Sequence, residues 1–173
     1  DLQPRDSTID ALAVQVSPQP PRLLVPLGGL DDLERKQLRL LHPLSFMEDP
    51  TRVLRGARLA ARLGFRFDRD TLELARRSLR TDVLSRVAPA RLRNELELAL
   101  AEPRLEPVFR QLEEVGALED MFGLNNAPEL LSALDRQAIN GPERSEAALL
   151  ALLLETPPEQ AEAHIRRFSW PGS

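Results

Sequence analysis

The sequence predicts a mainly α-helical protein that begins with a small α/β segment containing a hairpin. From about residue 50 onward, apolar residues recur every three or four positions, and glycines or prolines separate one such stretch from the next. The first 45 residues instead hold short apolar runs broken by prolines and a glycine pair. With 173 residues, 42% of them hydrophobic, the chain is long enough to bury one core or two small cores in series.

The N-terminal segment is expected to form a turn or a short hairpin. Residues 12–16 and 22–27 are extended candidates, and they flank a proline-rich stretch, 17–21, that limits strand pairing to an edge. Gly28-Gly29 then breaks the chain, and residues 31–39 are expected to form a short helix or turn in which Asp32 serves as a cap.

A long helix is expected to begin near Asp49-Pro50 and to end at Gly64. Its apolar positions share one face, and its arginines fall on the opposite side. The apolar positions are Val53, Leu54, Ala57, Ala60 and Ala61, and the arginines are Arg55, Arg58 and Arg62. Gly64 suits the left-handed residue that follows a helix, and Phe65 is placed to pack back onto the last turn.

Further helices are expected along the rest of the chain, because the same spacing and the same breaks recur. They cover residues 71–79, 89–101, 104–115, 128–137, 143–154 and 159–168. Asp68-Arg69-Asp70 precedes the first of these. We interpret it as a helix cap, with Asp70 accepting from amides of the first turn, rather than as a metal site.

Composition excludes several classes of protein. The chain has no cysteine, which rules out a disulfide framework and thiolate metal sites, and its two histidines, His42 and His164, lie far apart. No run of about eighteen apolar residues and no charged-then-apolar leader is present, so neither a membrane partner nor secretion is expected. A cytoplasmic protein fits this composition.

The charge distribution favours a polyanionic partner although the total charge is −4. Between residues 52 and 93 there are twelve arginines and four acids, which gives this stretch a net charge of +8. Arginine pairs bidentately with phosphate oxygens, so such a cluster suits RNA or a polyphosphate. For any single arginine, a solvated helix face that pairs with acids elsewhere is the simpler interpretation.

Asp49 and Arg52 form the most informative pair, because residues three apart at a helix entrance share a face. A carboxylate accepts hydrogen bonds from an exocyclic amine, and a guanidinium donates to ring nitrogens or a carbonyl oxygen, so the pair can read a nucleobase edge. The alternative is structural, because Asp49 before Pro50 also has the form of a helix N-cap. Glu48 lies four residues before Arg52, a spacing that allows an ion pair.

The segment 46–67 resembles the Glu-Asp-x-x-Arg motif of the class II tRNA nucleotidyltransferases and bacterial poly(A) polymerases. Residues 1–13 are similar to the Arg-Arg-Asp-Phe-Thr-x-Asn-Ala motif of that family, and residues 28–33 to its Gly-Gly-x-x-Asp-Leu segment. Residues 86–96 resemble the neck motif, and 106–124 the start of the helical body. Because four motifs occur in the order of the family over the first hundred residues, the resemblance is specific.

The resemblance implies a division into three parts and a set of site residues. Residues 1–45 correspond to a remnant of the nucleotidyltransferase head, 46–101 to the neck that recognises the base, and 102–173 to part of the helical body. The nucleotide-binding residues implied are Arg5, Asp6, Asp49, Arg52 and Arg55. Structural roles in the neck are implied for Glu48, Arg91 and Glu95. Arg5 and Asp6 can alternatively form a local ion pair.

The implied activity is template-independent addition of CMP and/or AMP to RNA 3′ ends, with ATP and CTP as substrates, Mg²⁺ as the metal and tRNA or another RNA as partner. CC-, A- and CCA-adding enzymes and poly(A) polymerases share these motifs. No Gly-Ser and Asp-x-Asp segment precedes the first motif, so no catalytic residue and no metal ligand is assigned, and the chain alone is expected to be inactive. Departures at Pro4, Ser7, Asp10 and Val25 favour the alternative of a non-catalytic RNA-binding or helical interaction module, and a helical scaffold for protein partners is a third possibility.

Overall fold

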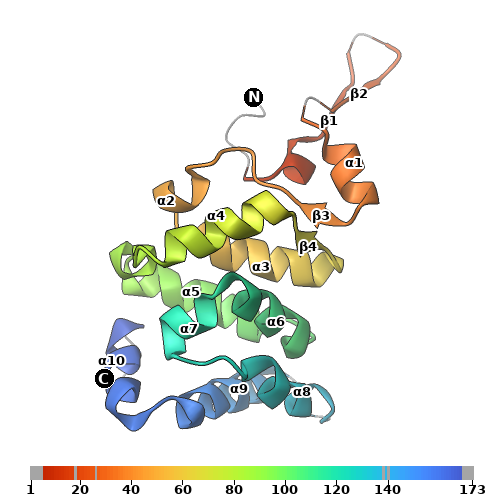
Figure 1. Cartoon of the computed structure of the whole chain (residues 1–173). Coiled ribbons are helices and arrows are strands. Elements are labelled where there is room, and N and C mark those ends of the chain that lie inside the picture. The colour runs from red at the N-terminus through yellow and green to blue at the C-terminus, as the bar shows by residue number, and fades with distance from the viewer. Residues whose placement is uncertain (1–5, 18, 26, 138, 140, 169–173) are drawn as a thin grey trace.

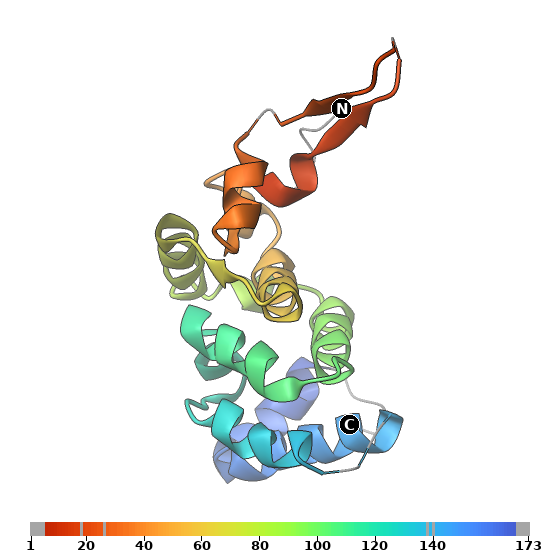
Figure 2. The same ribbon diagram turned by 90° about the vertical axis from the view of Figure 1, so that its right-hand side faces the viewer.

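The computed structural model describes residues 6–17, 19–25, 27–137, 139 and 141–168. The helices are stacked in layers, from the N-terminal hairpin at one end of the molecule to α8 and α9 at the other (Figures 1 and 2). This arrangement confirms the mainly helical fold with a small N-terminal α/β part. Within the described ranges, no helix combines the length and the apolar character needed to cross a membrane.

The expected hairpin forms and projects from the end of the molecule (Figure 2). Strands β1 (Ala13–Gln15) and β2 (Arg22–Leu24) pair in antiparallel fashion, with Val14 opposite Leu23. The short helix η1 (Thr8–Ala11) precedes the hairpin and α1 (Gly29–Glu34) follows it. A Cβ atom on Gly29 would lie 2.4 Å from the carbonyl oxygen of Thr8, so glycine is required where α1 packs directly against η1.

Asp32 is not a helix cap, contrary to expectation. Gly28, with φ of 73°, precedes α1, and Asp32 lies within the helix. Its buried carboxylate accepts a hydrogen bond from the hydroxyl of Thr8 at 2.5 Å and others from Nε and Nη2 of Arg39 at 3.0 and 2.8 Å. Because a buried carboxylate needs partners, Asp32 fixes η1 and the strand after α1 to one another.

Two short strands that the sequence pattern did not predict lie beside the long helix. β3 (Gln37–Leu38) and β4 (Arg66–Phe67) pair in parallel, with Gln37 opposite Arg66 and Leu38 opposite Phe67. One-turn helix α2 (Ser45–Glu48) then leads into α3 (Thr51–Leu63). Leu38, Phe46 and Phe67 are buried and join the core.

Helix α3 follows the sequence prediction closely. Val53, Leu54, Ala57 and Ala60 are buried, and Gly64 ends the helix in the left-handed conformation, with φ of 66°. The amide of Phe65 donates to the carbonyl of Ala60 at 2.8 Å, which is the contact expected after such a glycine.

The capping residue of α4 (Arg69–Leu79) is Asp68 rather than Asp70. The backbone of Asp68 is extended, and its Oδ2 accepts from the amide of Asp70 at 3.2 Å. Asp70 already has helical geometry, so its side chain is not placed to accept from the first free amides. The capping interpretation of the Asp-x-Asp sequence is therefore confirmed, with the role moved by two residues.

The remaining helices agree with the sequence pattern apart from two additions. The elements are η2 (Val83–Arg86), α5 (Pro89–Leu100), α6 (Leu105–Val115), α7 (Ala117–Phe122), α8 (Ala127–Asp135), α9 (Gly141–Glu155) and α10 (Pro158–Arg167). The short helices η2 and α7 were not expected. Gly116 and Gly123, both with positive φ, bound α7.

One continuous core joins α3 and α5 to the helices that follow them in the chain. Helix α6 packs against α3 and α8, and α3 also packs against α5. The core includes Phe109 at the centre of α6, and the rings of Phe122 and Phe168 stack with centroids 5.5 Å apart. Because both helices bury apolar side chains in this core, the position of α3 relative to α5 is fixed. Most side chains of the candidate site extend from these two helices.

Candidate nucleotide-binding site

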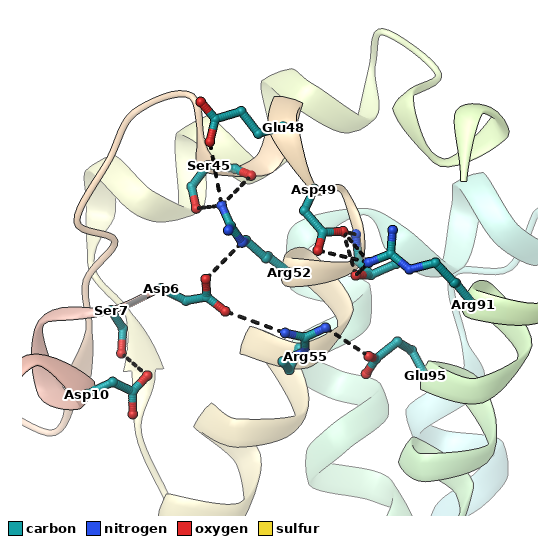
Figure 3. Close-up of polar contacts among 11 residues, drawn as sticks. Asp6, Ser7, Asp10, Ser45, Glu48, Asp49, Arg52, Arg55, Arg91 and Glu95 are labelled. Carbon is teal, nitrogen blue, oxygen red and sulfur yellow. Dashed lines mark hydrogen bonds and ion pairs between the residues drawn. The ribbon is translucent and has the colours of Figure 1, made fainter. Parts of the chain in front are cut away.

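The predicted site residues within the described ranges converge from three segments of the chain (Figure 3). Asp6 comes from the segment before η1, Asp49, Arg52 and Arg55 from the turn into α3 and its first turns, and Arg91 and Glu95 from the start of α5. Arg5 lies outside the described residues, so neither of its expected roles is assigned a geometry.

Arg52 is held by several acceptors at once. Its Nε lies 2.8 Å from Oδ1 of Asp6, and its Nη1 donates to the hydroxyl of Ser45 at 2.8 Å and to the Ser45 carbonyl at 3.3 Å. The expected pairing with Glu48 is present at 3.8 Å, with Glu48 largely exposed (Figure 3). The guanidinium is thereby fixed toward Asp6 and α2.

Arg55 bridges the N-terminal segment and α5. Its Nη1 lies 3.6 Å from Oδ2 of Asp6, and its Nη2 donates to Oε1 of Glu95 at 3.3 Å. The Glu95 side chain is buried, and its Oε2 has no hydrogen-bond partner in the described part of the chain. Buried carboxylates without partners are costly, so this pair with Arg55 is the main compensation for burying Glu95.

Asp49 is engaged by its own turn and by α5. Its Oδ1 accepts from the amide of Thr51 at 3.2 Å and from the Thr51 hydroxyl at 2.7 Å, while Nη2 of Arg91 reaches Oδ1 at 3.0 Å and Oδ2 at 2.9 Å. Burial raises the pKa of Asp49, but the hydrogen bonds from Thr51 and Arg91 outweigh it and lower the pKa below its ordinary value. The carboxylate is therefore ionised at neutral pH.

Asp49 and Arg52 do not form one continuous edge in this structure. The sequence places them on one helix face, but Asp49 belongs to the turn before α3 and points toward Arg91, whereas Arg52 points toward Asp6 (Figure 3). Recognition of a base by the two together stays a prediction. The Asp49 side chain does accept from a main-chain amide, as the capping alternative requires.

A small cavity of about 50 Å³ lies beside Arg52 and Arg55. Asp6 and the two arginines give it polar walls, and its floor is apolar. The apolar lining consists of Leu38, Leu40, Phe46, Leu59 and Phe67, next to Gly56. A Cβ atom on Gly56 would lie 3.0 Å from Cζ of Phe67, so the glycine in α3 allows the Phe67 ring to approach closely.

Two site residues escaped the sequence analysis: Ser45 holds Arg52, and Thr51 holds Asp49. Arg91, for which a structural role was implied, contacts Asp49 rather than Glu95, the residue with which it was grouped. The Thr51 contact has a sequence signal, because aspartate commonly accepts from the amide two residues later in a turn. The partners of Arg91 and Glu95 lie about forty residues away along the chain and give no local signal.

The described residues contain no cluster of metal-ligating side chains. No group of three or more histidine, cysteine, aspartate or glutamate side chains among them is arranged to hold an ion. Asp68, from the single Asp-x-Asp sequence, is used as a cap. Magnesium requires several oxygen ligands, so we assign no chemical step to a metal held by these residues.

Comparison with known proteins places the chain in a family. Residues 64–134 match the family described as the probable RNA- and SrmB-binding site of polymerase A. The A-adding tRNA nucleotidyltransferase of Aquifex aeolicus is 39% identical over 123 residues, which cover 70% of this chain and 15% of that protein. The chain belongs to the class II tRNA nucleotidyltransferase family. It spans a minor part of the length of the curated relatives that it matches.

Solved structures of the family agree with this assignment over nearly the whole chain. A CCA-adding enzyme in complex with ATP is 30% identical with a TM-score of 0.82, and the match covers 98% of this chain and 43% of that one. The Thermotoga maritima CCA-adding enzyme complexed with tRNA is 29% identical with a TM-score of 0.82, and the match covers 99% of this chain and 45% of that one. The class II tRNA nucleotidyltransferase fold therefore extends over the described residues.

Proposed function

We propose that this chain supplies nucleotide selection and RNA docking in an enzyme that adds CMP and/or AMP to RNA 3′ ends without a template. In this reaction the RNA 3′ hydroxyl attacks the α-phosphate of ATP or CTP, and pyrophosphate leaves. The observation that carries the proposal is the ion-pair cluster of Asp6, Arg52 and Arg55, which lies beside the turn where Asp49 pairs with Arg91. The names of the relatives, which are A-adding and CCA-adding enzymes, support it.

Each residue is given a role that its chemistry allows. The Asp49 carboxylate accepts from the exocyclic amine of the base, and Arg52 donates to a ring nitrogen or carbonyl oxygen. Asp6 and Arg55 hold ribose or phosphate, together with Arg5. Asp6 pairs with both arginines, so a nucleotide that contacts the two guanidiniums competes with Asp6 for them. Glu48 and Glu95 keep the two guanidiniums in place.

The three-part organisation belongs to the same proposal. Residues 1–45 contribute to the head, 46–101 form the neck that reads the base, and 102–173 form part of the body. RNA docking is supported by the family match over residues 64–134 and by the tRNA complex of the Thermotoga maritima relative. Exposed arginines that form no ion pair with described residues offer contacts to phosphates. Between residues 52 and 93 they are Arg66, Arg69, Arg76, Arg80 and Arg86.

Magnesium is part of the proposed reaction, because nucleotidyl transfer requires neutralisation of charge on the phosphates. We assign neither its ligands nor a catalytic side chain to this chain. The isolated 173 residues are therefore expected to be inactive, and incorporation of labelled AMP or CMP into tRNA by them would contradict this expectation. The cytoplasmic location expected from the composition stays a prediction.

Calorimetric titration with ATP and CTP tests the nucleotide site directly. Asp49→Asn and Arg52→Gln are expected to weaken nucleotide binding by about ten- to hundredfold, because each removes one charge-assisted hydrogen bond. Arg77→Gln is the matched control, since the one ion pair that Arg77 forms within the described part of the chain is with the exposed Glu73 one helical turn away. Equal binding by all three variants would refute the assignment of the site.

The second candidate is a non-catalytic RNA-binding module. It is supported by the family match over residues 64–134, whose description names binding of RNA and of SrmB but no reaction. This alternative predicts salt-sensitive RNA affinity in a chain that does not distinguish ATP or CTP from UTP. The same titrations, with UTP added, separate the two functions.

A further inference from the structure

The two oxygens of Asp49 are not equivalent. Oδ1 accepts from the Thr51 amide, the Thr51 hydroxyl and Nη2 of Arg91. Among the described residues, Oδ2 accepts only from Nη2 of Arg91, at 2.9 Å. A carboxylate oxygen has two lone pairs, so Oδ1 is fully used while Oδ2 keeps one acceptor position.

Thr51 produces this difference within the turn, and Arg91 contacts both oxygens from outside it. Arg91 lies in the first turn of α5, and its Nη2 also donates to the Thr51 hydroxyl at 3.2 Å, so it closes a ring of contacts around Asp49. The side chain is 54% exposed, so it reaches Asp49 across the surface between α5 and α3 (Figure 3). Thr51 and Arg91 together leave the carboxylate little rotational freedom.

In the proposed function, the orientation and the charge of the Asp49 carboxylate decide which bases can bind. Adenine and cytosine present an exocyclic amine, which donates to an ionised carboxylate, whereas guanine and uracil present a carbonyl oxygen at the corresponding position. An ionised Asp49 attracts the amine and repels the carbonyl oxygen. A carboxylate that rotates freely or becomes protonated loses this discrimination, because a protonated carboxyl can also donate.

We propose that Arg91 is a positioning residue for nucleotide selection. It directs Oδ2 of Asp49 toward the base and thereby favours adenine and cytosine over guanine and uracil. The inference rests on the proposed function, in which Asp49 reads the base. It assigns to Arg91 more than the structural role in the neck that the sequence implies. Arg52 cannot take this role in the observed arrangement, because its contacts are to Asp6, Ser45 and Glu48.

Nucleotide preference is the measurement that separates positioning from structural support. Dissociation constants for ATP, CTP, UTP and GTP are determined by calorimetry for the unmodified chain, Arg91→Gln, Arg91→Lys and the control Arg77→Gln. In Arg91→Gln, the preference for ATP and CTP over UTP and GTP is expected to fall about tenfold or more, as for one lost charge-assisted hydrogen bond. Arg91→Lys, which keeps the charge, is expected to retain part of the preference for ATP and CTP. The control Arg77→Gln is expected to retain all of it.

One further variant and two further measurements distinguish a loss of positioning from a loss of folding. Thr51→Val removes the hydroxyl that donates to Oδ1 and accepts from Arg91 but leaves the Arg91 side chain itself in place, and it is expected to reduce the preference in the same direction as Arg91→Gln. Carbon-13 NMR of the Asp49 carboxyl reports its pKa, which is expected to rise toward its ordinary value in Arg91→Gln. Urea unfolding confirms that each variant is folded under the conditions of the titrations.

The possible results distinguish failure of the inference from failure of the proposed function. If the unmodified chain binds all four nucleotides equally or binds none, the proposed function fails and the inference fails with it. If the unmodified chain prefers ATP and CTP, and folded Arg91→Gln keeps that preference, only the inference is overturned. A uniform loss of affinity for all four nucleotides in Arg91→Gln also overturns it, because that is the result of a merely structural role.

Discussion

Replacing Glu102 with glutamine is expected to destabilise the fold by about 3 kcal/mol. Oε1 of Glu102 lies 3.2 Å from Nη1 of Arg58 and 3.1 Å from Nη2 of Arg62, and the Glu102 side chain is 10% exposed. Removing one partner of a buried ion pair costs about 3–5 kcal/mol, because the other charge stays buried without compensation. The low end of this range applies because the amide oxygen of glutamine still accepts.

The geometry assigns most of this effect to Arg58. Arg58 is 16% exposed, and its Nε already lacks a partner among the described residues, whereas Arg62 is 55% exposed and can be solvated. Arg62→Gln is therefore expected to cost no more than about 1 kcal/mol, as an exposed pair does. Because the side chain of Glu102 joins α3 to the junction of α5 and α6, its loss also loosens the helix that carries Arg52 and Arg55.

Urea unfolding followed by circular dichroism measures both values, and thermal unfolding checks them. For a chain of this size, about 3 kcal/mol corresponds to a decrease in Tm of about 6–12 °C. The reasoning is refuted if Glu102→Gln lies within about 1 kcal/mol of the unmodified chain, or if Arg62→Gln costs as much as Glu102→Gln. The first result would mean that the Glu102 carboxylate is effectively solvated, and the second that Arg62 contributes as much as Arg58 to the ion pair.

Three other results are expected. Asp135→Asn should cost about 1–3 kcal/mol at pH 7, because Asp135 accepts from the amides of Leu105 and Glu106 and pairs with Arg144. Burial raises the pKa of Asp135, but these contacts outweigh it and lower the pKa below 3.8. The stabilisation is therefore present above pH 3.8 and is lost as pH falls through the lower pKa of the folded state. Urea unfolding of both proteins across pH 3–7 should show that the difference between their free energies of unfolding shrinks in acid. Gly64→Ala should cost about 1–2 kcal/mol in urea unfolding through its positive φ alone, since a Cβ there meets no atom within 4 Å, and an unchanged midpoint would contradict this. Arg69→Gln should reduce the salt dependence of single-stranded RNA binding by about 0.7 in logarithmic slope if Arg69 contacts a phosphate, and an unchanged slope would exclude that contact.

The parts of the fold that the sequence predicts are those with repeated local spacing. Helix α3, for example, shows several turns of apolar residues and a glycine stop, so both its buried face and its end could be predicted. The pair β3 and β4 has two residues in each strand, which is too short for any period, and its partners are separated by α3. Helix α7 has six residues between two glycines in the left-handed conformation and resembles a turn in the sequence.

The candidate site divides in the same way between local and distant contacts. The turn in which Thr51 donates to Asp49 and the pairing of Glu48 with Arg52 span two and four residues, and such contacts follow from local geometry. The contact of Arg91 with Asp49 spans 42 residues and depends on how α5 packs against α3. Spacing along the chain therefore suggests Asp49 as a site residue but does not reveal what orients it.

The structure changes the meaning of the basic stretch between residues 52 and 93. Seven of its twelve arginines form ion pairs with acids, several of which lie outside the stretch, and Arg76 donates to the carbonyl of Glu114. An arginine that neutralises a nearby carboxylate contributes little to the field at a phosphate, because the two charges largely cancel beyond a few ångströms. The net charge of +8 therefore overstates the attraction of this surface for RNA. Arg66, Arg69, Arg76, Arg80 and Arg86 form no ion pair with described residues, so a salt dependence equivalent to at most about five phosphate contacts is expected of this stretch.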